Sequence, residues 1–539
     1  MKEILTAFLC LLSTACAVCT VQQEPLANEN KDGLYAKSIE QVLRLEPEQI
    51  DIGIAALIVS EQWSDMVGGR RYQQMLDEMA LEIRNRLGAK GLKPNQQAIP
   101  VINEYLFDEL GFKSVKEADD PNDLFLHRVL DKKQGYCLSL SILYLAIGER
   151  LGISLYGVVV PGHFFVRYDD GNMRFNIETT SSGGTASDDH YIKKFKVHQS
   201  RDGNIYMTNL NPLQTLGCFF NNLGNSYLAI NNNKQALASF IKAVEINPNL
   251  AEARANLGNM YLQEGNTEDA INEYRLALQL SPEDARVFNN LGNAYAQKDL
   301  IDQAIVQYNY SIKLDPNVAD AYRNLSIMYN RKKLFDRSLV NIEKAISLEP
   351  KNHDLYLQKG EIYREKKECE KAILEFEKAL QLKPDFAEAY YRTGLCCKDT
   401  GQAEEEISAY KRAISIKPDF VPAINGLGNA YFNKKMFDEA LEQYKLAAKI
   451  EPGESTVYYN IGAAYSNKEE HKNAVEAYLK AVEIDPSMGD AHYGLAYGYY
   501  NLKDYKNSLK HLQISQKLGV EIDKQLLSAV EEMLKKTKE

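Results

Sequence analysis

The residues best suited to chemistry in this chain are Cys137, His163 and Glu178, which follow one another within a short stretch. A cysteine thiol becomes a nucleophile when a histidine takes its proton, and an acid can orient that histidine and stabilise its charged form. Cys137 is also the only cysteine between residues 20 and 217. Because it has no local partner for a disulfide, its thiol is predicted to stay available, even in an oxidising compartment.

The surrounding sequence predicts a helix followed by strands. After QGYC, the run LSLSILYLAIGERLG has the length and apolar content of a helix, and Gly152 ends it. The runs ISLYGVVV, HFFVRY and MRFNIET have the composition of β-strands. Unpaired N–H groups and the helix dipole stabilise an anion at a helix start, so Cys137 is placed where a thiolate is favoured.

The last two strands predict how the histidine and the acid meet. They flank the sequence DDGN, in which Asp170-Gly171 is a strong signal for a two-residue hairpin turn. That turn pairs Tyr168 with Met173 and sets His163 directly opposite Glu178. Directly opposed side chains have Cβ atoms roughly 5 Å apart, which is within hydrogen-bonding reach for an imidazole and a carboxylate.

An acyl-transfer site also needs donors for the oxyanion. The backbone N–H of Cys137 is one candidate, and the side chain of Gln134 is a weaker second. Taken singly, each residue of the trio has a structural interpretation: a packed cysteine, a packed strand histidine and a solvated glutamate. Their joint spacing favours a site. His190 and His198 with Asp188 and Asp189 lack the spacing of metal ligands, so neither a metal nor a cofactor is predicted.

A regular repeat of 34 residues begins near residue 217, with prolines from Pro248 to Pro486 at that spacing. Each repeat predicts two amphipathic helices, in which a glycine such as Gly258 lets the helices approach and a tyrosine such as Tyr261 fills the gap. About nine units span 217–522, and 523–539 is predicted to be a capping helix. One unit cannot bury its apolar face alone, but a stack can.

Several repeats carry the string NLGN or a close variant. An asparagine amide offers donors and an acceptor, so a ladder of asparagines can hold an extended peptide backbone without reading its side chains. The alternative is that these asparagines are simply common at these repeat positions and face the solvent. The predicted ladder consists of Asn222, Asn225, Asn256, Asn259, Asn290, Asn293, Asn324, Asn429 and Asn460.

The stretch around the trio resembles the transglutaminase-like superfamily, whose fold is related to that of papain-type cysteine peptidases. Cys137 in GYCLSLS, His163 in GVVVPGHFFVRY and Glu178 in IETT match the family's nucleophile, histidine and acid. The family's acid is usually aspartate, so the carboxylate here reaches one methylene further. The resemblance covers about residues 40–190. The wider block, YLFDELGF through DDPNDLFLHRVLDKKQG, resembles a bacterial branch that is often joined to tetratricopeptide repeats. Some members of that branch lack the cysteine.

The 34-residue pattern resembles tetratricopeptide repeats. We therefore expect an α+β transglutaminase-like domain followed by an all-α tetratricopeptide superhelix. The expected boundaries are an export signal at 1–19, a polar tether at 20–36, the transglutaminase-like domain at 37–200, a linker at 201–216, and then the repeats.

The N-terminus and the charge bear on location. Lys2, a short apolar run and small residues predict an export signal that is too short to span a bilayer. Ordinary cleavage and a lipoprotein signal with lipid on Cys16 both fit. The expected location is therefore the periplasm or cell envelope, with or without a lipid tether to the membrane. A net charge of -11 disfavours nucleic acid as a partner.

The leading hypothesis is thiol-dependent acyl chemistry on an amide or peptide, either hydrolysis or transfer, in a cysteine-dependent protease, amidase or acyltransferase. The repeats would bind a protein or peptide partner in their groove. The alternative is a scaffold for protein–protein interaction whose front domain is a catalytically silent docking domain, and a third option is a tether whose front domain regulates access. The sequence leaves the substrate, the partner and the oligomeric state open.

Overall fold

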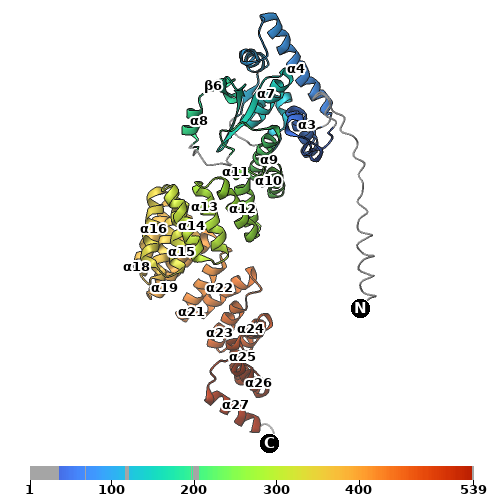
Figure 1. Ribbon diagram of the computed structural model, residues 1–539. Coiled ribbons are helices and arrows are strands. Elements are labelled where there is room, and N and C mark those ends of the chain that lie inside the picture. Colours follow the sequence, from blue (N-terminus) through green and yellow to red (C-terminus); the bar gives the residue numbers. More distant parts are fainter. Residues whose placement is uncertain (1–35, 67, 116–119, 196, 198–204, 537–539) are drawn as a thin grey trace, which may run out of the picture. The chain divides into compact units, whose positions relative to one another are not determined.

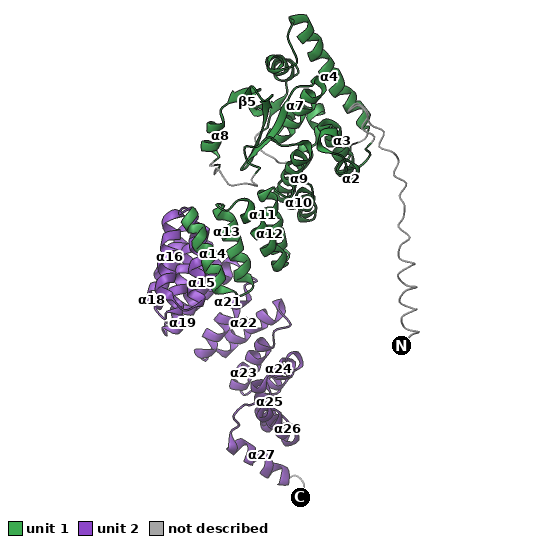
Figure 2. Cartoon of the chain, viewed as in Figure 1, with its two compact units in different colours: residues 1–314 green, residues 315–539 purple. Residues whose placement is uncertain are grey.

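The computed structural model describes residues 36–536 apart from 67, 116–119, 196 and 198–204. The chain divides into two compact units, residues 1–314 and 315–539 (Figure 2). The export signal predicted at 1–19, Cys16 as a lipidation site and the tether up to residue 35 lie outside the described residues. Among the described residues, no helix combines the length and the apolar character needed to cross a bilayer.

The front part of the first unit combines helices and a small sheet (Figure 1). Its strands are β1 (Lys113–Ser114), β2 (Gln134–Gly135), β3 (Leu155–Val160), β4 (His163–Asp169), β5 (Arg174–Glu178) and β6 (Gly184–Ala186). Its α-helices are α2 (Ile39–Val42), α3 (Ile52–Trp63), α4 (Gly69–Lys90), α5 (Ile99–Asn103), α6 (Leu126–Lys132), α7 (Cys137–Leu151) and α8 (Asp188–Lys194).

The main sheet is antiparallel, in the order β3-β4-β5-β6, and β1 and β2 form a separate parallel pair. Helix α7 packs on β3 and β4 with one side and on α3 and α4 with the other. It is therefore buried almost all round, with Leu140, Leu143 and Ile147 each at most 1% exposed. A helix that is apolar on every face needs such a central position, which explains the unbroken LSLSILYLAIG run.

The helix and strands predicted around the trio are present. Helix α7 begins at Cys137 and ends at Gly152, which adopts the left-handed conformation with a φ of 71°. That conformation costs little for glycine and lets its N–H bond back to the carbonyl of Glu149. The predicted α+β class of the front domain is confirmed.

From Pro212 to Lys536 the described chain consists of consecutive helix pairs followed by one final helix, which confirms the all-α tetratricopeptide class. The first unit contains α9 (Pro212–Ala229), α10 (Asn233–Ile246), α11 (Ala251–Gln263), α12 (Thr267–Leu280), α13 (Ala285–Gln297) and α14 (Ile301–Leu314). The second unit contains α15 (Ala319–Arg331), α16 (Phe335–Leu348), α17 (His353–Glu365), α18 (Cys369–Leu382), α19 (Ala387–Asp399), α20 (Ala403–Ile416), α21 (Val421–Asn433), α22 (Phe437–Ile450), α23 (Ser455–Asn467), α24 (His471–Ile484), α25 (Gly489–Asn501), α26 (Tyr505–Lys517) and α27 (Lys524–Lys536).

The packing inside most pairs differs from the prediction in one respect. The ring that fills the space beside the glycine belongs to the second helix, and the tyrosine three residues after the glycine is not that ring. A Cβ added to Gly258 would lie 2.7 Å from the ring of Tyr274, and one added to Gly428 would lie 2.5 Å from that of Tyr444. The glycine is therefore required because a buried aromatic ring occupies the position of its missing side chain.

The first repeat helix is part of the front domain's core. Helix α9 begins at Pro212, inside the segment 201–216 that the sequence predicted as a linker. Asn211 caps the helix through Gln214 N, and a proline at the first helical position suits this start. The ring of Phe220 meets that of Trp63 edge-on, with centroids 5.0 Å apart. Buried aromatic contacts thus join the first repeat to the front domain.

Candidate active site

The start of helix α7 fixes the position of Cys137. Tyr136 is extended and acts as the N-cap residue, and its N–H donates to Ser139 Oγ at 2.8 Å. Cys137 is the first helical residue, and it is half-buried. Its carbonyl accepts a hydrogen bond of 3.4 Å from Thr179 Oγ1, which also lies 3.0 Å from Ser141 Oγ. Thr179 therefore joins the start of the helix to the end of strand β5.

The register between β4 and β5 corrects the predicted hairpin. Tyr168 pairs with Phe175 instead of Met173, because residues 170–173 form a longer turn. Asp170 causes the difference: its Oδ1 accepts hydrogen bonds from the N–H groups of Asn172 and Met173. An aspartate that binds its own backbone in this way stabilises a turn that the Asp-Gly pair alone does not reveal.

The corrected register shifts β5 by two residues. The prediction placed His163 directly opposite Glu178. In the structure His163 lies diagonal to Glu178 instead. A shift of two keeps each side chain on its predicted face, because side chains alternate along a strand. The two groups still meet, with His163 Nε2 2.7 Å from Glu178 Oε2. The extra methylene of glutamate, relative to the family's aspartate, suits this diagonal contact.

Three further groups hold the Glu178 carboxylate. Its Oε1 accepts the N–H of Thr180 at 3.1 Å and the hydroxyl of Thr180 at 2.5 Å. Its Oε2 accepts the hydroxyl of Tyr191 at 3.0 Å. The carboxylate is thus fixed at both oxygens, and it can in turn fix the orientation of His163.

The charges of the pair follow from these contacts. Burial by itself favours the neutral carboxyl, but hydrogen bonds from His163 and Thr180 outweigh it and lower the pKa of Glu178 to about 2. Burial likewise opposes charging of the imidazole, but hydrogen bonding to Cys137 and Glu178 raises the pKa of His163 to about 9. The arrangement therefore favours an imidazolium at His163 beside an ionised Glu178 carboxylate.

The side chain of Cys137 lies near enough to the imidazole to help raise the pKa of His163. Because Nε2 is engaged by Glu178, Nδ1 is the ring nitrogen left to exchange a proton with the thiol. Sulfur, imidazole and carboxylate thus stand in the order that nucleophilic catalysis requires. The predicted trio is brought together from α7, β4 and β5.

Helix α8 forms one wall of the site, and the sequence did not predict this. The ring of Phe195, directly after the helix, stacks on His163 with centroids 5.0 Å apart and planes at 4°. The ring of Tyr191 stacks on Phe165 at 3.8 Å. These contacts limit the rotation of the imidazole. The run DDHYIKKF has acids at its start, lysines near its end and aromatic residues four positions apart, which was the available signal for a helix packed on the sheet.

An ion pair between a buried arginine and a partly exposed aspartate anchors that helix. Arg167 of strand β4 is fully buried, and its guanidinium donates to Asp188 Oδ1 and Asn176 Oδ1, each at 2.7 Å. Asp188 is one of the residues considered above as a weak metal ligand, so this carboxylate is engaged with an arginine. His190 shares the exposed side of the same helix, and His198 lies outside the described residues. No metal-binding group of three ligand residues occurs in the described parts of the chain.

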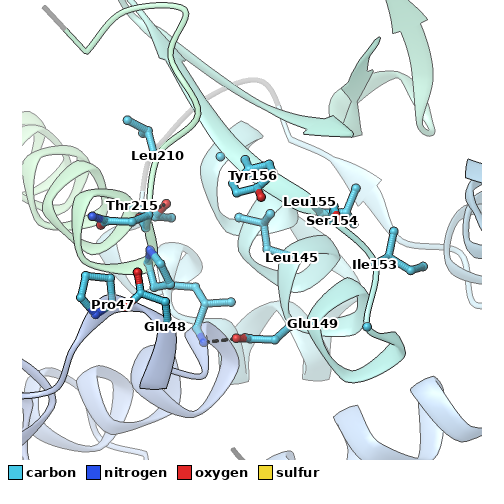
Figure 3. Close-up of a pocket in the computed structure, with 15 residues that line it drawn as sticks. Pro47, Glu48, Leu145, Glu149, Ile153, Ser154, Leu155, Tyr156, Leu210 and Thr215 are labelled. Carbon is cyan, nitrogen blue, oxygen red and sulfur yellow. Dashed lines mark hydrogen bonds between the residues drawn. The ribbon is translucent and has the colours of Figure 1, made fainter. Parts of the chain in front are cut away.

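Gln134, the other predicted donor, precedes the trio in β2, and one cavity of the front domain does not include the trio. Gln134 is in β2, three positions before Cys137, and its oxyanion role remains a prediction. A cavity of about 450 Å³ lies at the opposite end of α7, where Leu145 and Glu149 point into it (Figure 3). Glu149 Oε2 there accepts the N–H of Ile52 at 2.9 Å. This cavity does not include Cys137, His163 or Glu178.

The asparagines of the repeats form a ladder, but they bond to one another. Asn256 Nδ2 donates to Asn225 Oδ1 at 3.2 Å, and Asn290 Nδ2 donates to Asn259 Oδ1 at 2.9 Å. The second asparagine also accepts the tyrosine hydroxyl of its own repeat, as Asn259 does from Tyr274 at 2.7 Å. Some of the hydrogen-bond donors and acceptors of these side-chain amides thus join consecutive repeats. Peptide binding by the ladder stays a prediction. The other ladder residues occupy equivalent helix positions, in α9, α13, α15, α21 and α23: Asn222, Asn293, Asn324, Asn429 and Asn460.

Comparison with known families agrees with this architecture. Residues 70–216 match the transglutaminase-like superfamily. Models of tetratricopeptide repeats match residues 224–318 and 360–488. The chain is a transglutaminase-like domain joined to tetratricopeptide repeats. As a class, such repeats bind protein or peptide partners.

Individual relatives match parts of the chain. A UPF0162 protein of Xylella fastidiosa is 32% identical over 120 residues, which is 22% of this chain and 42% of that protein. F-box only protein 21 of Mus musculus is 36% identical over 76 residues, 14% of this chain and 12% of that protein. The chain therefore spans less than half the length of these curated relatives. Among solved structures, a tetratricopeptide repeat protein of Parabacteroides merdae is 15% identical with a TM-score of 0.37, covering 46% of this chain and 98% of its own.

Proposed function

We propose that the front domain carries out thiol-dependent acyl chemistry on an amide or peptide, with Cys137 as nucleophile. The observation that carries the proposal is the 2.7 Å contact between His163 Nε2 and Glu178 Oε2, which leaves Nδ1 for the thiol. His163 acts as base and then as acid, and Glu178 holds its tautomer and stabilises the imidazolium. The backbone N–H of Cys137, with Gln134 as a second donor, stabilises the oxyanion.

The reaction balances without a cofactor. The thiol proton passes to His163, and the sulfur attacks the substrate carbonyl to give a tetrahedral oxyanion. Collapse of that intermediate breaks the C–N bond, and the imidazolium returns its proton to the leaving amine. The resulting thioester at Cys137 is then attacked by water, which gives hydrolysis, or by a second amine, which gives transfer.

The repeats complete the proposal by binding a protein or peptide partner in their groove, which supplies or presents the substrate. The asparagine ladder and the confirmed repeat class support this role. Export to the periplasm or cell envelope belongs to the same proposal. The mass of the processed protein tests the export proposal. Ordinary cleavage after the small residues and lipidation of Cys16 give different masses.

The decisive experiment traps the thioester. Incubation with p-nitrophenyl acetate is expected to add an acetyl group to Cys137 with release of p-nitrophenolate, seen by intact-mass spectrometry. Cys137→Ala is the matched control and is expected to stay unmodified. Addition of a primary amine then separates the two outcomes, because transfer yields the acetylated amine and hydrolysis yields acetate.

The competing proposal is a scaffold with a catalytically silent front domain. Phe195 stacks directly on the His163 ring, and such cover over the imidazole is the observation that favours it. A folded wild-type protein that forms no acetyl adduct, while Cys137 also resists small alkylating agents, would establish the scaffold.

A further inference from the structure

The second unit contains a basic cavity between helices α22, α23 and α24. Its volume is about 360 Å³. Lys445 and Lys449 reach it from α22, and Lys480 reaches it from α24, while Glu476 is the one acid in its lining. Three lysines facing one carboxylate make this cavity locally positive in a chain whose net charge is -11.

The three lysines differ from neighbouring lysines in the same unit. Lys434 is paired with Glu404, and Lys468 Nζ lies 2.5 Å from Asp438 Oδ1. Lys445, Lys449 and Lys480 are exposed, and none of them forms an ion pair with any other residue that the structure describes. Their charges are therefore available to a ligand, and no internal carboxylate has to be displaced first.

Two tyrosines hold the ammonium groups at the cavity. Lys445 Nζ lies 5.2 Å from the ring centre of Tyr465, and Lys480 Nζ lies 5.6 Å from that of Tyr458. Such cation–π contacts restrict flexible lysine side chains and lower the entropy lost when a ligand binds. The same pair recurs one repeat earlier, where Lys411 lies 5.6 Å from the ring of Tyr431.

We propose that this cavity binds an acidic polypeptide segment of a partner protein, whose carboxylates pair with Lys445, Lys449 and Lys480. The tyrosine rings and the apolar side chain of Ile461 pack against the methylene groups of the acidic side chains of that segment. An acidic peptide is favoured over nucleic acid because the chain's overall negative charge repels a dense polyanion more strongly than a short run of carboxylates.

The proposal rests on the partner-binding role of the repeats and not on the chemistry of Cys137. It assigns the partner a charge and a position, α22 to α24. Its failure therefore leaves the acyl proposal untouched, because Cys137 labelling and peptide binding are measured separately on the same full-length protein.

The test is fluorescence anisotropy with a fluorescein-labelled hexaglutamate peptide and the full-length protein, at low and high salt. Binding is expected at low salt and is expected to weaken as salt screens the charges. A labelled Gly–Ser peptide of equal length is expected not to bind. Lys480→Glu is expected to weaken hexaglutamate binding roughly tenfold, because one attraction is replaced by a repulsion.

The matched control is Lys472→Glu, which changes the same helix by the same charge but lies outside the cavity. It is expected to bind within about twofold of wild type. Lys445→Gln provides a milder variant should charge reversal unfold the repeat, and it is expected to weaken binding in the same direction. Absence of hexaglutamate binding, equal losses in the two Lys→Glu variants, or equally tight binding of single-stranded DNA at this cavity would overturn the proposal.

Discussion

Tyr191 and His163 bind the same oxygen of Glu178, at 3.0 and 2.7 Å respectively. The tyrosine comes from α8 and the histidine from β4, so one carboxylate links the helix that walls the site to the strand that carries the base. The orientation of the imidazole thus depends on a helix that follows the trio in sequence.

Replacing Tyr191 by Phe removes this hydroxyl and leaves the stacking surface in place. We expect alkylation of Cys137 to slow about fivefold, which corresponds to a lost hydrogen bond of about 1 kcal/mol. The rate of iodoacetamide labelling at neutral pH measures the effect. Tyr206→Phe serves as a control outside this contact. An unchanged rate in Tyr191→Phe would show that Thr180 and His163 alone fix the carboxylate.

Shortening the acid tests the diagonal geometry. Glu178→Asp keeps the charge but withdraws the carboxylate by one methylene, although aspartate is the residue usual in the family. Because His163 is diagonal to position 178, we expect this variant to lose most of the labelling rate that Glu178→Gln loses. Wild-type labelling in Glu178→Asp would mean that the strands adjust their register to the shorter side chain.

The pH dependence of stability follows from the two shifted pKa values. Glu178 is lowered from 4.5 to about 2, so its stabilising effect is present above pH 4.5 and is lost as the pH falls towards 2. His163 is raised from 6.5 to about 9, so its effect is complete below pH 6.5 and is lost as the pH rises through 9. The pair therefore stabilises the domain most between pH 4.5 and 6.5.

Thermal unfolding followed by the fluorescence of Trp63, the only tryptophan, measures this effect. The difference in Tm between wild type and Glu178→Gln is expected to be largest near pH 5.5 and to shrink above pH 9. Each kcal/mol lost corresponds to about 2–4 °C in a domain of this size. A difference that does not vary with pH would contradict the assigned charges.

The repeat packing gives a prediction with a control in the turn that follows the same helix pair. Gly428→Ala places a Cβ against the buried ring of Tyr444, so we expect a loss of about 1–3 kcal/mol in the free energy of unfolding. Gly453→Ala is the control, because an added Cβ there meets no atom within 4 Å. Chemical denaturation followed by circular dichroism compares them. Equal stabilities would mean that the ring moves aside without cost.

Much of this architecture was predictable because it depends on local signals. The start of α7 at Cys137 follows from a long apolar run closed by a glycine, and the repeat follows from its spacing. The turn after β4 was predicted wrongly because the choice between two turn lengths depends on the side chain of Asp170, which caps its own loop. The face of the sheet on which Glu178 lies was nevertheless predicted correctly. The error in the register of β5 was two residues, and a shift of two keeps a side chain on the same face.

The wall of the site was beyond prediction because it depends on tertiary contacts. Tyr191 and Phe195 belong to the segment that buried Arg167 anchors through Asp188, a contact that no local pattern specifies. The hydrogen bonds between asparagines of the ladder were also beyond prediction. The spacing of the repeats was evident from the sequence, but the pairing of the side-chain amides was not. Contacts between segments that are distant in the sequence therefore become visible only in the structure.

The rate of iodoacetamide alkylation at Cys137 as a function of pH, in wild type and in His163→Ala, tests the central claim most directly. We predict rapid alkylation of the wild type at neutral pH, because the imidazolium stabilises the thiolate. In His163→Ala we predict a rate about tenfold to a hundredfold lower at pH 7, rising only in alkaline solution as for an ordinary thiol. Identical pH profiles for the two proteins would contradict the claim that the imidazole activates the sulfur.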